Sequence, residues 1–298
     1  MNKMHDVIVI GGGYAGMAAA LQLLRARRRV LVIDAGMRRN RFARHTHGFL
    51  GRDGIPSNQI VVESREQLAM YPDLVWVDDE AVSVSGVRDN FEVSLRRGQI
   101  HPGRRILFAT GVRDTLPAIE GIEARWGRSV FHCPYCHGYE LDQGPIGVLG
   151  SSPMSAHQAE LLTEWGTITF LPNDATALND TKRDALQASG VTIENTAIER
   201  LEGEANVRLV DGRLLSFVGL FVSTTVSPVS DAPVRAGCEL EETPLGTMLR
   251  TDATQQTTIP GIYACGDVTD MPHSVSLAIG SGAMAGAQVH FSLVWPDA

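Results

Sequence analysis

Short runs of β-branched and aliphatic residues recur along the chain, and several of them lead into glycine-rich turns. Residues 6–10, Asp-Val-Ile-Val-Ile, have the composition of a buried parallel strand. Residues 11–16, Gly-Gly-Gly-Tyr-Ala-Gly, then open a helix that is predicted to continue through Leu24. A second strand is predicted at residues 30–33 and ends at Asp34. This order predicts a strand, a tight turn and a helix, followed by a parallel strand.

The same order returns halfway along the chain. Residues 145–149 predict a strand, residues 150–156 a turn, residues 157–165 a helix and residues 167–171 a second strand. Two Rossmann-like units account for a length of 298 residues, because each can bury its own core. The predicted fold class is therefore α/β with two dinucleotide-binding domains.

Two further segments have strand patterns that run into glycine. Residues 105–111 end in Ala-Thr-Gly, and residues 261–267 end in Cys-Gly-Asp. Such connections place backbone amides beside a ligand at the carboxyl edge of a parallel sheet, although either segment alone could be a structural turn. An alanine- and glycine-rich helix is predicted to follow, over about residues 275–291.

Two uncharged stretches are long enough to suggest a membrane span. Residues 7–24 are interrupted by three consecutive glycines, which favours a strand followed by a helix. Residues 274–295 are rich in Gly, Ala and Ser, which favours a closely packed interior helix. A formal net charge of −8 also disfavours nucleic acid or an anionic membrane as a partner. We expect no membrane and no nucleic acid.

The turn at residues 11–16 carries a complete dinucleotide fingerprint. Gly11, Gly13 and Gly16 form G-x-G-x-x-G between a strand and a helix, and Asp34 follows 23 residues after Gly11. In this motif backbone N–H groups and the helix N-terminus hold a pyrophosphate, and the carboxylate holds a ribose hydroxyl. The sequence predicts an adenine dinucleotide at this position.

The second turn has lost most of that fingerprint. Gly150, Ser152 and Ser155 occupy the three glycine positions. Asn173, with Asp174 beside it, stands where the acid is expected, and the next arginine for a 2′-phosphate is Arg183. These changes argue against NADPH as a second cofactor.

Residues 132–140, His-Cys-Pro-Tyr-Cys-His-Gly-Tyr-Glu, hold the two cysteines that are closest in sequence. The C-x-x-C spacing of Cys133 and Cys136 favours a small disulfide ring and a lowered thiol pKa. His137 follows directly and is a candidate proton carrier, with a pKa near neutrality; His132 is a second candidate. The motif indicates a redox-active dithiol.

Other chemistries use similar spacings. C-x-x-C-H is also the attachment motif of c-type haem, which is disfavoured because no export signal opens the chain. Zinc would need a second ligand pair, but Cys238 and Cys265 are isolated, so we expect no metal. A glutaredoxin-like module would carry the motif near the start of a shorter chain. Four cysteines without a disulfide framework favour a reducing cytoplasm.

Taken in order, these motifs resemble the low-molecular-weight thioredoxin reductase family of flavoproteins, over essentially the whole chain. The resemblance implies a discontinuous FAD domain at residues 1–113 and 242–298, around a domain at residues 114–241 that carries the dithiol. It also implies that Cys136 lies against the flavin and that Cys133 exchanges with substrate. The positive end of the closing helix would face the flavin ring. A homodimer is implied as well.

Departures from the family pattern point to one branch. His137 replaces the usual Asp, and Ser152 interrupts the second glycine motif. The motif resembles the branch that oxidises dithiols of small natural products, as in gliotoxin, holomycin and romidepsin biosynthesis. A loop with His45 and His47 resembles that branch too, and there it runs beside FAD. The residues expected at FAD are Gly11, Gly13, Ala15, Gly16, Asp34, Asn40, His47, Ala109, Thr110, Gly111, Gly266 and Asp267.

The expected function is oxidation of a small-molecule dithiol to a disulfide, with electrons passing to FAD and then to O₂ or another acceptor. Cys133, Cys136 and His137 are the expected catalytic residues. Two alternatives remain open at this point: an NADPH-dependent thioredoxin or disulfide reductase, and a flavin-bearing redox sensor.

Overall fold

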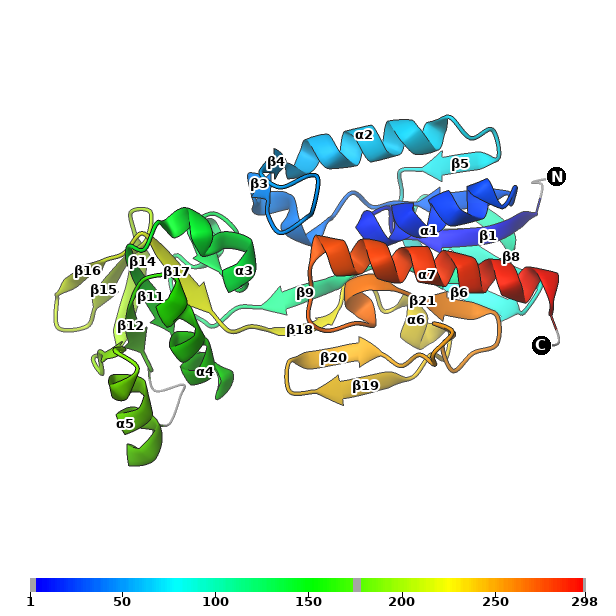
Figure 1. Ribbon diagram of the computed structural model, residues 1–298. Coiled ribbons are helices and arrows are strands. Elements are labelled where there is room, and N and C mark those ends of the chain that lie inside the picture. Colours follow the sequence, from blue (N-terminus) through cyan, green and yellow to red (C-terminus); the bar gives the residue numbers. More distant parts are fainter. Residues whose placement is uncertain (1–3, 174–177, 297–298) are drawn as a thin grey trace. The chain divides into compact units, whose positions relative to one another are not determined.

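The protein is described here from a computed structural model that covers residues 4–173 and 178–296 (Figure 1). Its contacts divide the chain into two units. The first unit contains residues 1–41, 48–113 and 226–298, and the second contains residues 42–47 and 114–225. An α/β fold with two Rossmann-like domains is confirmed. Asp174 lies outside the described residues.

The elements of the first unit come from both ends of the chain. Its strands are β1 (His5–Ile10), β2 (Val30–Ile33), β4 (Ile55–Pro56), β5 (Leu74–Val77), β6 (Ala81–Val87), β7 (Asn90–Leu95), β8 (Ile100–Phe108), β19 (Leu240–Thr243), β20 (Gly246–Leu249) and β21 (Ile262–Ala264). Its helices are α1 (Tyr14–Arg25), α2 (Ser57–Ala69), α6 (Ala232–Arg235), α7 (Val275–Val294) and the 3₁₀ turn η5 (Gly266–Val268).

The second unit is built from the middle of the chain. Its strands are β3 (His45–Thr46), β10 (Val130–Phe131), β11 (Pro145–Leu149), β12 (Thr167–Leu171), β13 (Thr192–Ile193), β14 (Ile198–Glu202), β15 (Asn206–Leu209), β16 (Leu214–Ser216) and β17 (Gly219–Val222). Its helices are α3 (Pro134–His137), α4 (Met154–Leu161), α5 (Asp180–Ala188), η2 (Glu123–Arg125), η3 (Tyr139–Leu141) and η4 (Leu162–Glu164). Three elements span the division: η1 (Arg39–Phe42), β9 (Val112–Thr115) and β18 (Thr225–Pro228).

The sheet of the first unit has the order β5-β2-β1-β8-β7-β6, and β21 pairs with the end of β8. Strand β1 is buried on both faces because its side chains alternate between two clusters. Val7 and Val9 pack with α1 and α7, whereas Ile8 and Ile10 pack on the other side with Phe91 of β7. This explains the uninterrupted apolar run that the sequence shows at this strand.

Helices α1 and α7 lie side by side over this sheet (Figure 1). A Cβ atom placed on Gly282 would lie 2.1 Å from the Ala15 carbonyl oxygen, so only glycine permits the approach. Within the described residues α7 is the one helix whose length and hydropathy would suffice to cross a membrane. Its buried stripe of small residues packs closely on α1, as the sequence predicted, but the prediction of an interior helix was wrong for the opposite face, where Leu277, Met284 and Phe291 are exposed.

The chain returns to the first unit earlier than the sequence suggested. The sequence placed residues 226–241 in the second domain, but contacts place them in the first. Ala232 and Cys238 join the core cluster that contains Ile8, and Val226 pairs with Gly246 of β20. Residues 226–241 contain no glycine motif and no strand of the second unit's parallel sheet. Only their packing shows that they belong to the first unit.

The second unit has a parallel sheet of order β10-β17-β11-β12-β13 and a separate antiparallel sheet, β14-β15-β16. The two predicted strands at residues 145–149 and 167–171 are β11 and β12. Helix α4 differs from its prediction, because it begins at Met154 rather than at residue 157.

Replacing Gly282 by Ala tests the packing of α7 on α1. The added methyl group would push the two backbones apart, so we expect a loss of about 1–3 kcal/mol in the free energy of unfolding, measured in urea. Gly280→Ala is the matched control, because its Cβ meets nothing within 4 Å. That variant should gain about 0.5–1 kcal/mol from helix propensity. Equal stability of Gly282→Ala and the unmodified chain would contradict the packing described.

Candidate functional site

Four strand ends converge at the carboxyl edge of the first sheet. Ile10 of β1 is in register with Ile33 of β2 and with Phe108 of β8, and Phe108 is in register with Ala264 of β21. The residues that follow these ends are therefore neighbours, although they come from four separate parts of the sequence. They include Gly11, Asp34, Ala109, Thr110 and Gly266, all of which the sequence assigned to cofactor binding.

Glycine is required where the first turn meets its neighbours. Gly11 has a φ of +110°, and a Cβ on it would lie 2.2 Å from the Ala109 carbonyl oxygen. A Cβ on Gly16 would lie 1.9 Å from the Gly11 carbonyl oxygen. These contacts bring the N-terminus of α1 close to the sheet edge. In contrast, a Cβ on Gly13 or Gly111 would meet nothing within 4 Å, so their faces border open space.

Asp34 is oriented by the turn that it faces. Its Oδ1 accepts hydrogen bonds from the backbone N–H of Gly12, at 3.2 Å, and of Gly36, at 3.1 Å. Within the described residues Oδ2 has no partner. A fixed carboxylate with one open oxygen suits the two hydroxyl groups of a ribose.

One buried hydroxyl at this edge also lacks a partner. The Oγ1 of Thr110 is buried and makes no hydrogen bond within the described residues. Buried polar atoms in proteins are almost always satisfied, so an unpaired one beside an open glycine indicates a ligand contact. The residues present therefore fit a dinucleotide such as FAD.

The C-terminal segment contributes the acidic side of the same region. Asp267 follows Gly266 in η5, and its Oδ2 lies 3.3 Å from Nη1 of Arg39. Asn40 donates a hydrogen bond to the Tyr14 hydroxyl, at 3.1 Å, beside the first residue of α1. Gly266 lies against Ala15, where a Cβ would approach within 2.6 Å. Loop and C-terminal residues thus meet around the first turn, as the sequence expected.

The corresponding turn of the second unit is closed by its own side chain. The Oγ of Ser155 accepts hydrogen bonds from the backbone N–H of Ser151, at 3.1 Å, and of Ser152, at 3.2 Å. The Ser155 side chain is fully buried. Such N–H groups would hold the pyrophosphate of a bound dinucleotide. Here a hydroxyl oxygen occupies them instead.

The residues at the positions expected to bind the ribose and the 2′-phosphate make hydrogen bonds within the protein. Asn173 accepts a hydrogen bond from the backbone N–H of Ile198 at 2.8 Å, so its side chain holds β14 in place. Arg183 donates to Asn195 across 3.4 Å. Neither side chain has the arrangement expected for binding NADPH.

Cys133 and Cys136 form a disulfide with a Cα–Cα distance of 5.3 Å. Cys133 is the N-cap of α3, and Pro134 occupies its first turn, where a missing N–H is harmless. The backbone N–H of Cys136 donates to the Cys133 carbonyl at 3.3 Å. The short helix thus holds the two sulfur atoms together, as the redox-dithiol hypothesis requires.

The environment of His137 differs from the one that the sequence suggested. Its ring stacks on Phe131, with centroids 4.2 Å apart. Burial, followed by electrostatic repulsion from His47, lowers the pKa of His137 to about 4. The expectation of a pKa near neutrality was therefore wrong for the disulfide form. At pH 7 the ring is neutral and retains a nitrogen that can accept a proton.

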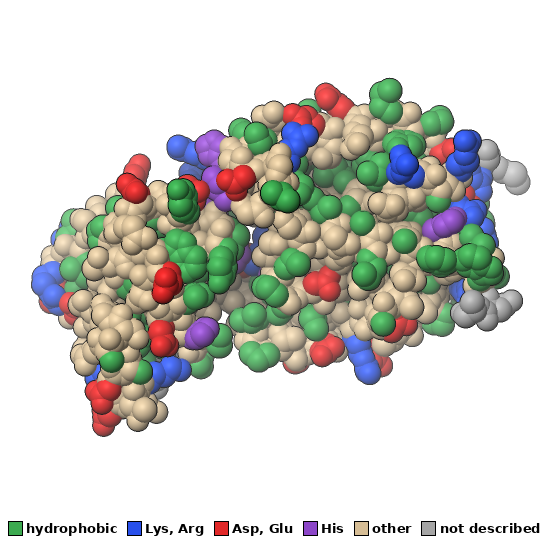
Figure 2. Space-filling model, viewed as in Figure 1, with side chains coloured by type: hydrophobic (Ala, Val, Ile, Leu, Met, Phe, Trp, Pro, Cys, Tyr) green, Lys and Arg blue, Asp and Glu red, His purple; other side chains and the backbone are tan. Residues whose placement is uncertain are grey.

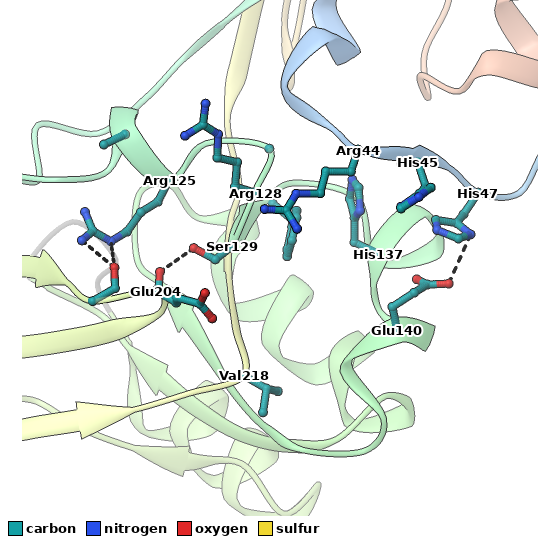
Figure 3. Close-up of a pocket in the computed structure, with 14 residues that line it drawn as sticks. Arg44, His45, His47, Arg125, Arg128, Ser129, His137, Glu140, Glu204 and Val218 are labelled. Atoms are coloured by element: carbon teal, nitrogen blue, oxygen red, sulfur yellow. Dashed lines mark hydrogen bonds and ion pairs between the residues drawn. The ribbon is translucent and has the colours of Figure 1, made fainter. Parts of the chain in front are cut away.

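His47, expected beside FAD, belongs to the second unit by its contacts. Its Nδ1 lies 3.2 Å from Oε1 of Glu140, which follows His137 by three residues (Figure 3). His45 and His47 have ring centroids 6.3 Å apart. The segment at residues 42–47 therefore brings an imidazole to the Cys-x-x-Cys-His motif.

A pocket of about 430 Å³ opens beside this motif, within the second unit. Phe131, His137 and Glu140 line it on the side of the motif, and Arg44 and Arg128 line it elsewhere. In Figure 3 the Arg44 side chain extends from its segment toward Ser129 and Arg128. We call this cavity the arginine pocket.

Sequence reasoning missed several of these residues. Glu140 was visible three positions after His137, a spacing that places two residues on one side of a helical turn. Ser155 was noted as a lost glycine, but its hydrogen bonds to the turn were not expected. Arg44 and Arg128 carry no local sequence signal, because they are 84 residues apart (128 − 44).

Comparison with known proteins adds an independent finding. Residues 5–282 match the sequence pattern of the pyridine nucleotide-disulphide oxidoreductase family. A solved oxidoreductase from Agrobacterium tumefaciens is 47% identical, with a TM-score of 0.96 over 99% of this chain and all of the other. The structure of HlmI is 35% identical, with a TM-score of 0.91 over 99% and 94% of the two chains. Thioredoxin reductase sirT of Leptosphaeria maculans is 29% identical over 99% of this chain and 96% of its own.

The lowered pKa of His137 predicts a pH-dependent stability. Between pH 6.5 and 4 the unfolded chain binds a proton at this ring and the folded disulfide form does not, so acidification favours unfolding. The free energy of unfolding should fall by up to about 3 kcal/mol across this range from His137 alone. In His137→Gln, urea unfolding at pH 7 and pH 4.5 should show a smaller fall. Identical falls in both proteins would contradict the burial of a neutral ring.

Proposed function

Because this chain belongs to the pyridine nucleotide-disulphide oxidoreductase family, an FAD-binding enzyme family, we propose that it oxidises a small-molecule dithiol to a disulfide. The observation that carries the proposal is the self-bonded turn at Ser155. It occupies the amides that a reductase would offer to NADPH, while the Cys133–Cys136 disulfide is retained. Electrons are then expected to come from the substrate dithiol and not from NADPH.

The exchange uses the two cysteines in sequence. A substrate thiolate attacks the sulfur of Cys133, the Cys133–Cys136 bond breaks, and Cys136 leaves as a thiolate. The second substrate thiolate then attacks the substrate sulfur of the mixed disulfide, which closes the substrate disulfide and releases Cys133. Two electrons pass from substrate to the cysteine pair, and the two thiol protons must be accepted elsewhere.

His137 is suited to accept one of those protons. Its neutral ring at pH 7 can act as a base, but a pKa of about 4 makes it a weak one while the disulfide is intact. The thiolate of Cys136, on the adjacent residue, stabilises the protonated ring once the disulfide opens. Proton uptake by His137 is thereby coupled to thiolate formation.

FAD is held by residues of the first unit. Gly11, Gly13 and Gly16 would approach its phosphates, Asp34 would bind a ribose, and Asp267 would lie at the ribityl side. Bound FAD supplies the electron-accepting chemistry that restores the cysteine disulfide, with O₂ or another molecule as the final acceptor. The remaining FAD positions proposed from the sequence are Ala15, Asn40, His47, Ala109, Thr110, Gly111 and Gly266.

Cys133→Ser and Cys136→Ser test the proposal directly. Each variant should lose dithiol oxidation, measured with small dithiols in air, and should keep its yellow flavin absorbance because FAD is held elsewhere. His137→Ala should slow oxidation by roughly 10²-fold through loss of a proton acceptor. Normal turnover in either cysteine variant would refute the proposal.

A matched experiment separates an oxidase from a reductase. The reductase is the activity in the name of the fungal relative, thioredoxin reductase sirT. Under anaerobic conditions a dithiol substrate should bleach the flavin absorbance and NADPH should not. Rapid bleaching by NADPH would show a reductase. Bleaching by neither, together with a stable complex with a protein partner, would favour a redox sensor.

We further propose that the protein is a homodimer that uses the outer face of α7. Leu277, Met284 and Phe291 recur along this helix and Trp295 follows its last residue, and each has 48–55% of its surface exposed. Figure 2 shows hydrophobic side chains along the region of α7 seen in Figure 1. An exposed apolar stripe of this length is typical of a surface that a second copy covers.

Met284→Asp should shift the protein from dimer to monomer in analytical ultracentrifugation, because it places a charge in the apolar stripe. Val87→Asp, at an exposed residue of β6, is the control and should remain dimeric. A monomer in the unmodified protein, or a dimer in Met284→Asp, would exclude this interface.

A further inference from the structure

The arginine pocket has a local charge opposite to that of the chain. Arg44, Arg125 and Arg128 line it together with two acids, Glu140 and Glu204. The formal charge of these five groups is +1, whereas the whole chain has a formal charge of −8. Positive charge has therefore gathered at one cavity of an otherwise acidic protein, which favours an anionic ligand there.

Two of the arginines have free guanidinium groups. Arg125 is held by the carbonyl oxygens of Gly121 and Gly203 at 2.7 to 3.0 Å, which fixes one wall of the pocket. Arg44 and Arg128 make no side-chain hydrogen bond or ion pair within the described residues. Their donors remain available, and guanidinium groups match carboxylates in geometry.

Neither acid of the pocket forms an ion pair with Arg44 or Arg128 within the described residues. Glu140 lies against His47, at 3.2 Å, on the side of the Cys-x-x-Cys-His motif. The Glu204 carboxylate forms no ion pair within the described residues, although its backbone oxygen accepts a hydrogen bond from Ser129. Figure 3 shows its side chain near Ser129, on the side of the pocket opposite to Glu140.

One residue links the pocket to the redox disulfide. His137 lines the pocket and directly follows Cys136, so their Cα atoms are about 3.8 Å apart, although neither cysteine lines the pocket. A small molecule could therefore place its sulfur atoms at the disulfide while another group extends past His137. Phe131, stacked on His137, gives that path an apolar side.

We propose that the arginine pocket binds an anionic group of the substrate, so that the preferred substrates are small dithiols that carry a carboxylate. This rests on the proposed dithiol oxidation and specifies its substrate class. Arg44 and Arg128 are specificity-determining residues, which bind the carboxylate and take no part in thiol exchange. The apolar chain of the dithiol lies along Phe131.

Dihydrolipoate and dihydrolipoamide provide a matched test, because they share one dithiol and one carbon chain and differ in the charge at its end. The unmodified holoenzyme should oxidise dihydrolipoate with the higher kcat/KM, through a lower KM at similar kcat. This preference should shrink as salt is raised, since the arginines are exposed. Oxidised lipoate should also inhibit more strongly than lipoamide.

Arg44→Gln and Arg128→Gln should each reduce the preference about two- to fivefold, by raising KM for dihydrolipoate alone. Arg235→Gln is the control, because Arg235 is an exposed arginine of the first unit without a side-chain partner in the described residues. This variant should keep the kcat/KM values of the unmodified protein for both substrates. All three variants should keep the flavin absorbance of the unmodified protein.

The outcomes separate the two proposals. Oxidation of neither compound, nor of any other dithiol, would refute dithiol oxidation and the pocket assignment with it. Oxidation of both compounds with equal kcat/KM, unaffected by either glutamine substitution, would leave the oxidase in place and overturn the carboxylate site. Loss of activity toward both substrates in Arg44→Gln would also overturn it, because a carboxylate contact cannot affect dihydrolipoamide.

Discussion

The fold depends on close backbone contact at the carboxyl edge of one parallel sheet. Gly11 contacts the carbonyl of Ala109, and Gly16 contacts the carbonyl of Gly11, at separations that no side chain permits. The register of β1, β8 and β21 then brings residues near 11, 109 and 266 together. Packing of α7 on α1 through Gly282 joins the C-terminal segment to the same region. The cofactor site is a consequence of these contacts.

The two turns show how one local pattern can serve opposite purposes. In the first, open glycine faces and an unpaired Thr110 hydroxyl leave room for a ligand. In the second, the Ser155 hydroxyl accepts the N–H groups that a pyrophosphate would otherwise use. A single oxygen atom, supplied by the chain itself, thus satisfies two backbone N–H groups of the second turn.

The chemistry of the second unit depends on how charge is distributed around one imidazole. Burial, followed by electrostatic repulsion from His47, lowers the pKa of His137 to about 4 while the cysteines are joined. In the proposed exchange, opening the disulfide would form a thiolate at Cys136, the residue next to His137, and this negative charge would favour the protonated ring. Arg44 and Arg128 line the same pocket as His137.

The sequence alone determined the family, the FAD fingerprint and the dithiol, because each is a short pattern in which spacing fixes local geometry. Gly11, Gly13 and Gly16 lie in one turn between a strand and a helix, Asp34 directly follows the next strand, and Cys133 and Cys136 lie within one turn of helix. Tertiary structure decided what depends on distant residues: the return of the chain at Val226, the lowered pKa of His137, and the pocket formed by Arg44 and Arg128. Burial and charge act through space, so no local pattern encodes them.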